Sequence, residues 1–156
     1  MKSRRLASLA LVAAVLVGTS GCALISPQAT LIPYAPADGV SAHSGDVAVR
    51  NALIVSDDGI EGNFLAAFVN EGTEPVTLRI SYGEGAEKTE LTLRVPVNPP
   101  ISLGMDGEND PLPFPDIDTM PGATMPVYFQ AGDAEGSLVE VPILTGQTDY
   151  LAPFVP

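Results

Sequence analysis

Two stretches of the chain alternate strictly between apolar and polar residues. Residues 76–82 carry apolar side chains at even positions, and residues 90–95 carry them at odd positions. A period of two turns one side of a strand toward a core and the other toward water, as in an antiparallel sheet with one wet face. We therefore predict two β-strands here, with Arg79 and Arg94 on the wet face near Glu90.

Four further segments have the composition of strands. Residues 46–56 place most of their large apolar side chains at odd-numbered positions. The interruption of this row at Asn51 predicts a β-bulge. Residues 63–70 are apolar on both parities, which is typical of a central strand covered on both sides. Strand patterns return in residues 124–130 and 137–144.

Residues 96–122 contain seven prolines and several acidic residues. Proline cannot donate to the hydrogen-bond ladder of a central strand. We predict only two short extended pieces in this region, at residues 100–103 and 112–114, joined by an acidic loop.

No segment after residue 45 shows a long 3.6-residue period, and short strands are separated by turns every 8–12 residues. This pattern predicts one all-β domain over residues 45–145. The expected fold is an immunoglobulin-like or cupredoxin-like antiparallel β-sandwich of about seven strands. Residues 146–156 then form a C-terminal tail.

The N-terminus has the organisation of an export signal. A short basic region is followed by residues 6–21, which carry no charge and include an apolar core too short for a comfortable membrane span. Small residues lead directly to Cys22. The order resembles a bacterial lipoprotein signal, with Thr19 where Leu is commonest. We therefore predict that residues 1–21 are cleaved, that Cys22 carries diacylglyceryl and palmitate-type acyl chains, and that residues 22–44 form a tether.

Charge and cysteine content narrow the function classes. The 156-residue chain has a formal net charge of −12, and without residues 1–21 four basic residues face nineteen acidic ones, a net charge of −15. Nucleic-acid binding rests on clustered Lys and Arg and is not expected. The excess acid also repels anionic lipid, so acyl chains must supply the anchoring. A single cysteine excludes an intramolecular disulfide, a Cys-based zinc site and a dithiol redox centre.

No catalytic constellation is visible in the sequence, and we predict a protein that is not an enzyme. The one histidine, His43, lies in a polar stretch and is expected in an exposed loop. Residues 106–110 begin like a calcium loop, but the sixth position is Pro111 and the twelfth is Ile117, where Gly and Glu are needed. Copper is the remaining metal to consider, because thioether and imidazole ligands select Cu(I). The candidate ligands are His43, Met105, Met120 and Met125.

The C-terminal half resembles a known family of copper proteins. Residues 120–130 and 136–143 are similar to the end of the periplasmic copper chaperone PCu(A)C domains, in which a Pro-Gly turn, a strand, a Gly turn and a Val-Pro-containing strand close the domain. The resemblance implies a cupredoxin-like sandwich. The copper motif of that family is a His-Met pair, a further Met and a His-x-Met. Ser44 follows His43 here, and residues 109–114 contain neither His nor Met. The fold can carry over without the copper site.

The mature chain also resembles the actinobacterial LpqE-type lipoproteins. The resemblance rests on Cys22, residues 34–39, residues 45–56 and the C-terminal segment, and so covers most of the mature chain. It implies a lipid-anchored, non-enzymatic domain of the cell envelope.

The leading functional hypothesis is a lipid-anchored β-sandwich at the outer face of the cytoplasmic membrane, acting as a binding or accessory module for an envelope or membrane-protein partner. The alternative is a copper chaperone-like protein, with copper as the one cofactor considered. Contact with the partner is expected through the loop at residues 104–118 and the tail at residues 145–156. Both segments carry large apolar groups outside the main strands: Leu112, Phe114, Tyr150, Leu151, Phe154 and Val155.

Overall fold

The computed structural model describes residues 8, 10, 12, 37–83, 88–104 and 109–156. The chain divides into two units, residues 1–34 and residues 35–156, and nearly all described residues belong to the second. Ser8, Ala10 and Val12 of the first unit are helical. Within the described ranges, no helix has the length and apolar character needed to cross a membrane.

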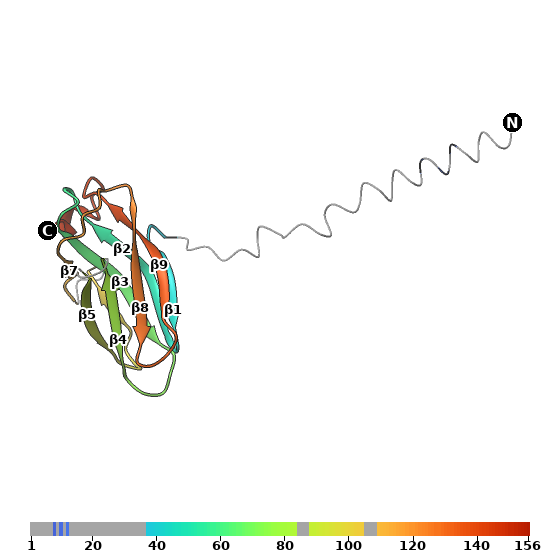
Figure 1. Cartoon of the computed structure of the whole chain (residues 1–156), viewed down its shortest axis with the longest axis horizontal. Helices are drawn as coiled ribbons and strands as arrows, with labels where there is room; N and C mark the ends of the chain where they lie inside the picture. Colours follow the sequence, from blue (N-terminus) through green and yellow to red (C-terminus); the bar gives the residue numbers. More distant parts are fainter. Residues whose placement is uncertain (1–7, 9, 11, 13–36, 84–87, 105–108) are drawn as a thin grey trace. The chain divides into compact units, whose positions relative to one another are not determined.

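Nine β-strands and one short 3₁₀ helix make up the described part of the second unit (Figure 1). They are β1 (Val40–Ser44), β2 (Val47–Val55), β3 (Gly62–Asn70), β4 (Val76–Tyr82), β5 (Thr89–Val95), β6 (Ile101–Leu103), β7 (Leu112–Phe114), β8 (Thr124–Ala131), β9 (Ser137–Leu144) and η3 (Ala152–Phe154). The strands follow the order β5-β4-β8-β9-β2-β3-β6, with β1 also paired to β2 and β7 also paired to β3.

Strand β9 joins the two halves of the sandwich. It pairs antiparallel with β8 along most of its length. At its end, Ile143 and Leu144 pair in parallel with Ile54 and Val55 of β2. The sheet thus becomes mixed and curls into a nearly closed, barrel-like sandwich with its two edges at β5 and β6. The all-β, cupredoxin-like prediction is confirmed. Seven of the nine described strands form the main path of the sheet, in agreement with the expected number of about seven. The expectation of purely antiparallel pairing is corrected, because β2 and β9 pair in parallel.

The predicted bulge in β2 is present at Asn51. The register of β2 against β3 shifts between Arg50 and Leu53, and Asn51 has a φ of 50°. Asparagine is among the few residues that tolerate this left-handed conformation. Its side-chain Oδ1 accepts a hydrogen bond of 2.8 Å from the Gly39 backbone N–H. The bulge therefore also holds the chain that enters β1.

The sequence predicts a tether and an exposed loop before residue 45, but strand β1 lies inside this range. Ala42 and Ser44 are buried, and Ser44 Oγ accepts a 2.9 Å hydrogen bond from the Ala131 backbone N–H and donates one of 2.8 Å to the Glu135 carbonyl oxygen. The folded domain therefore begins before residue 45, and His43 lies in a strand, not a loop. The residues that β1 buries are too small to show a clear apolar alternation.

The main core lies between the two layers of the sandwich and contains a chain of aromatic rings. Phe114 of β7 stacks on Phe64 of β3, with centroids 4.9 Å apart, and on Tyr82 of β4, with centroids 4.1 Å apart. Phe64 also contacts Phe68 and Phe129. These rings link strands of both layers, so β7 contributes to the core although it has only three residues.

A second, smaller core covers the outer side of β2 and β3. Leu53, Val55 and Leu65 are fully buried there against Leu151 of the C-terminal segment. Phe154 and Val155 pack against the same cluster. This arrangement agrees with the prediction that β3 is covered on both sides. The cover on its outer side is the C-terminal segment, which the sequence predicts to be a tail.

Candidate functional site

Three segments that each carry acidic residues meet at one end of the sandwich. They are the β2–β3 loop, residues 115–123 and the C-terminal segment. Ile117 N donates to the Ile60 carbonyl oxygen at 3.0 Å, and Gly146 N donates to Asp57 Oδ1 at 2.9 Å. We call this the acidic end, defined by Asp57, Asp58, Glu61, Asp116 and Asp118. None of the three segments contains Lys or Arg.

The β2–β3 loop is held by Ser56 and Asp58. The buried Ser56 Oγ donates to the Glu61 carbonyl oxygen at 2.6 Å and accepts from Gly59 N at 3.0 Å. Asp58 Oδ1 accepts from Ile60 N at 2.8 Å and from Glu61 N at 3.3 Å. These backbone donors lower the pKa of the Asp58 carboxyl below its usual value, because they stabilise the charged form. The loop therefore presents a fixed negative charge.

The segment that follows β7 presents two more carboxylates in an unusual backbone conformation. Asp116 and Asp118 have φ angles of 52° and 42°, while Ile117 between them is buried. Thr119 N donates to the Gly59 carbonyl oxygen at 3.1 Å, which fixes the segment along the β2–β3 loop. Left-handed residues other than glycine concentrate where a loop must aim its side chains. Here the conformation buries Ile117 and leaves both aspartates exposed.

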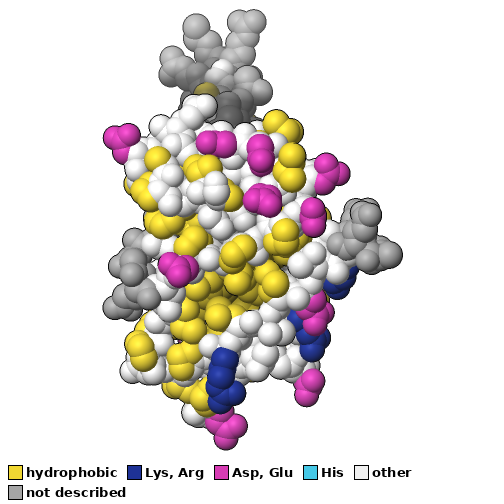
Figure 2. All heavy atoms as spheres, turned by 90° about the vertical axis from the view of Figure 1, so that its left-hand side faces the viewer, with side chains coloured by type: hydrophobic (Ala, Val, Ile, Leu, Met, Phe, Trp, Pro, Cys, Tyr) yellow, Lys and Arg dark blue, Asp and Glu magenta, His cyan; other side chains and the backbone are white. Residues whose placement is uncertain are grey.

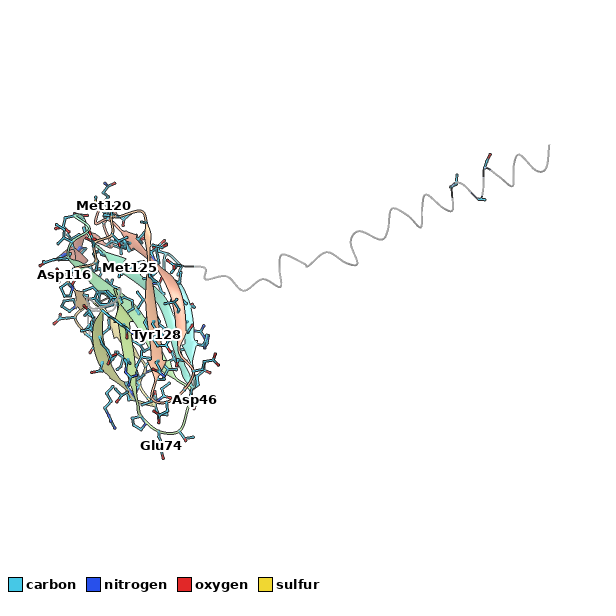
Figure 3. The ribbon with its side chains drawn as sticks, in the orientation of Figure 1. Asp46, Glu74, Asp116, Met120, Met125 and Tyr128 are labelled. Atoms are coloured by element: carbon cyan, nitrogen blue, oxygen red, sulfur yellow. The ribbon has the colours of Figure 1, made fainter. Side chains whose placement is uncertain are left out.

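A cavity of about 350 Å³ opens beside these aspartates. It is lined by Asp116, Asp118, Thr119 and the thioether-bearing Met125, which is itself almost fully buried. Figure 3 places Asp116, Met120 and Met125 toward the same end of the domain. Hard carboxylate oxygens dominate this set, and a positively charged group is the ligand that they suit.

Apolar side chains lie within this acidic surface. Ile60 and Met120 expose 60% and 64% of their surface, and the two loops that carry them touch at Gly59. Figure 2 shows acidic side chains gathered over the upper part of one face, with the basic ones lower down and to one side. The acidic end therefore combines exposed carboxylates with two exposed apolar side chains.

The copper candidates do not come together. Met120 and Met125 lie at the acidic end, whereas His43 is next to Ser44, which bonds Ala131 at the far end of β8. Met125 and Ala131 are six positions apart on that strand, a separation of about 20 Å. Nε2 of the exposed His43 ring instead lies 3.2 Å from Nη1 of Arg50. Across the described ranges, no three His, Cys, Asp or Glu side chains are grouped closely enough to hold a metal ion. Met105 lies outside the described residues.

The predicted partner contacts divide into different classes. Phe114 is fully buried in the main core, which corrects its assignment to a contact surface. Leu112 is partly buried against that core, and Phe154 packs on the second core while its carbonyl oxygen accepts a 3.0 Å hydrogen bond from Asn63. Tyr150 is 48% exposed, and its hydroxyl donates to the Asp38 carboxylate. Of the four, only Tyr150 is well exposed.

The structure adds Ile60 to the candidate surface and shows that Asp116 and Asp118, within the predicted contact loop, are exposed. The sequence showed the acidic loop but not which of its side chains point outward. Cys22 lies outside the described residues, so its lipidation stays a prediction.

Comparison with known proteins supports the fold. No family model matches the chain, and no curated protein matches it. Among solved structures it is similar to the copper-bound PCuAC domain from PmoF2, with 9% identity and a TM-score of 0.51. The match covers 68% of this chain and 98% of that one. At this identity the likeness concerns the fold alone, and it agrees with the cupredoxin-like resemblance of the C-terminal half.

Proposed function

We propose that this protein is a lipid-anchored lipoprotein at the outer face of the cytoplasmic membrane, where its β-sandwich serves as a non-enzymatic binding or accessory module. The observation that carries the proposal is Cys22, the only cysteine of the chain, directly after a charge-free apolar segment. The resemblance to LpqE-type lipoproteins points the same way. The folded unit at residues 35–156 supports it as well, since it is compact without the N-terminal segment.

The acidic end is the surface at which we propose that the partner is bound. Its carboxylates are exposed, Asp58 is held in its charged form, and no basic residue in the same segments neutralises them. The complementary partner is an envelope or membrane protein with a basic surface. Attraction of this kind is screened by salt. The complex captured from detergent-solubilised membranes should therefore weaken as ionic strength rises.

Replacement of the anchor residue tests the proposal directly. The Cys22→Ala variant has no thiol to carry the acyl groups. We therefore expect it to move from the membrane fraction to the aqueous fraction and to incorporate no labelled palmitate. Cell fractionation with metabolic labelling measures both. Ser20→Ala is the matched control, and this variant should stay lipidated. Unchanged membrane retention of Cys22→Ala would refute the anchor.

Copper handling is the second candidate, because the fold is similar to a copper-bound domain. The arrangement of the donors opposes a site shared by His43 and the methionines. We therefore expect that His43→Ala leaves the affinity for Cu(I) unchanged, as measured by titration against a competing chelator. A stoichiometric, tight Cu(I) site that is lost in His43→Ala would replace the module proposal with a copper chaperone.

A further inference from the structure

The sheet ends in edge strands, and β5 differs from the others. An exposed edge presents unpaired backbone donors and acceptors, which natural proteins protect by short length, proline or bulges. Strands β6 and β7 have three residues each, and β7 contains Pro113. The pairing of β1 is irregular between Val40 and Ala42. Strand β5 has seven residues without proline and pairs with β4 in unbroken register. Within the described residues, β5 is thus the one long and regular edge.

The sequence of β5 is complementary to itself in the antiparallel direction. An antiparallel pair of β5 strands centred on Thr92 sets Thr92 against Thr92 of the second copy. Leu91 then faces Leu93, and Glu90 faces Arg94, once on each side of the two-fold axis. Directly opposed side chains on one face of such a pair have Cβ atoms about 4.5–5.5 Å apart, where opposite charges attract and apolar groups pack. A two-fold axis requires this self-complementarity.

Side-chain exposure agrees with that arrangement. Leu91 and Leu93 are partly buried against the main core, and Glu90, Thr92 and Arg94 are exposed on the outer face. Figure 2, which looks at the side of the molecule where Figure 1 shows β5, has an apolar area in the middle of the face. Pairing at β5 would extend the sheet across two molecules and add cover to the partly buried Leu91 and Leu93.

The charged side chains on the outer face of β4 and β5 are compatible with antiparallel pairing of two β5 strands. Glu90 Oε1 lies 3.3 Å from Arg79 Nε of the neighbouring strand, an exposed ion pair. Arg94 forms no ion pair with any described residue. A second copy would therefore bring to Arg94 a carboxylate that the described residues of its own chain do not supply. The domain is strongly acidic, and three of its four basic residues (Arg79, Lys88 and Arg94) lie on or beside β4 and β5, where repulsion between two copies is smallest.

We propose that the protein forms a two-fold symmetric dimer through antiparallel pairing of its β5 strands, with Thr92 on the axis and two Glu90–Arg94 ion pairs across it. This interface is separate from the acidic end, which stays open to a partner. It does not depend on the proposed function.

Cross-linking of the full chain in membranes tests the register. Thr92→Cys sets two thiols opposite each other, close to the Cβ separation that a disulfide takes. We expect a disulfide-linked dimer under mild oxidation. Thr77→Cys, on the outer face of β4 in register with Arg94, is the matched control. Its two copies would be three strand spacings apart, about 14 Å, and also offset by four residues along the strands, so they should not cross-link. The wild type controls for Cys22.

Charge reversal tests the ion pairs. Arg94→Glu sets two carboxylates opposite each other at both symmetric points, so we expect the association constant to fall about tenfold in analytical ultracentrifugation. The double variant Glu90→Arg/Arg94→Glu exchanges the two charges and should restore it. Circular dichroism shows whether each variant keeps the β-fold. Three results would each overturn the proposal: equal cross-linking of Thr92→Cys and Thr77→Cys, no cross-linking of either variant, or no rescue by the double variant. The β5 edge would then be open to pairing with a strand of another protein.

Discussion

Phe114→Ala is expected to lower the free energy of unfolding by about 3–5 kcal/mol. The side chain is fully buried, and its ring stacks between those of Phe64 and Tyr82. Removing it takes away the ring contacts and opens a cavity between the two layers, which the paired strands around it cannot close. Chemical denaturation followed by circular dichroism measures the loss.

Tyr150→Ala is the matched control for this substitution. It also truncates an aromatic side chain, but one that is 48% exposed and whose hydroxyl hydrogen-bonds Asp38 at the surface. Its expected cost is no more than about 1 kcal/mol. If both substitutions changed stability equally little, Phe114 would not be a core residue, and the partner-contact assignment would return.

Leu151→Ala is expected to cost about 2–5 kcal/mol, although it lies only five residues from the C-terminal Pro156. Its side chain is buried against Leu53, Val55 and Leu65 on the outer side of the sheet. The truncation would expose the centre of the second core and loosen the C-terminal segment. Both the denaturation midpoint and the hydrogen-exchange protection of β3 should fall.

Leu138→Ala provides the comparison. Leu138 lies in β9 and is 65% exposed, so the same chemical change should alter stability by about 0.5 kcal/mol or less. A cost for Leu151→Ala as small as that for Leu138→Ala would show that the C-terminal segment is a loose tail, as the sequence suggested, and not a structural cover.

The regular strands could be predicted because their side chains report the burial of each face. The alternation in residues 76–82 and 90–95 corresponds closely to β4 and β5, and Arg79 and Glu90 meet on the outer face as expected. The bulge at Asn51 was visible as a polar residue in an apolar row. Even the short strands β6 and β7 could be found between their prolines.

The candidate site was less predictable. Phe114 and Tyr150 are both large aromatic residues in irregular surroundings, and nothing local distinguishes the one that fills the core from the one that faces water. His43 and Met125 are both candidate copper ligands by residue type, but in the fold they lie about the length of strand β8 apart. The acidic end depends on hydrogen bonds between the β2–β3 loop and residues 117–119, which are some sixty positions away along the chain.

The sequence by itself determined the class of fold, the regular strands and the predicted anchor at Cys22. Each of these follows from neighbouring residues, because side-chain periodicity and the order of a signal segment are local properties. Only the tertiary structure decided that the last residues cover the sheet, that three distant segments form the acidic end, and that β5 is left as an open edge. Those features depend on which surfaces remain after the strands have paired, and that choice is made by packing across the whole domain.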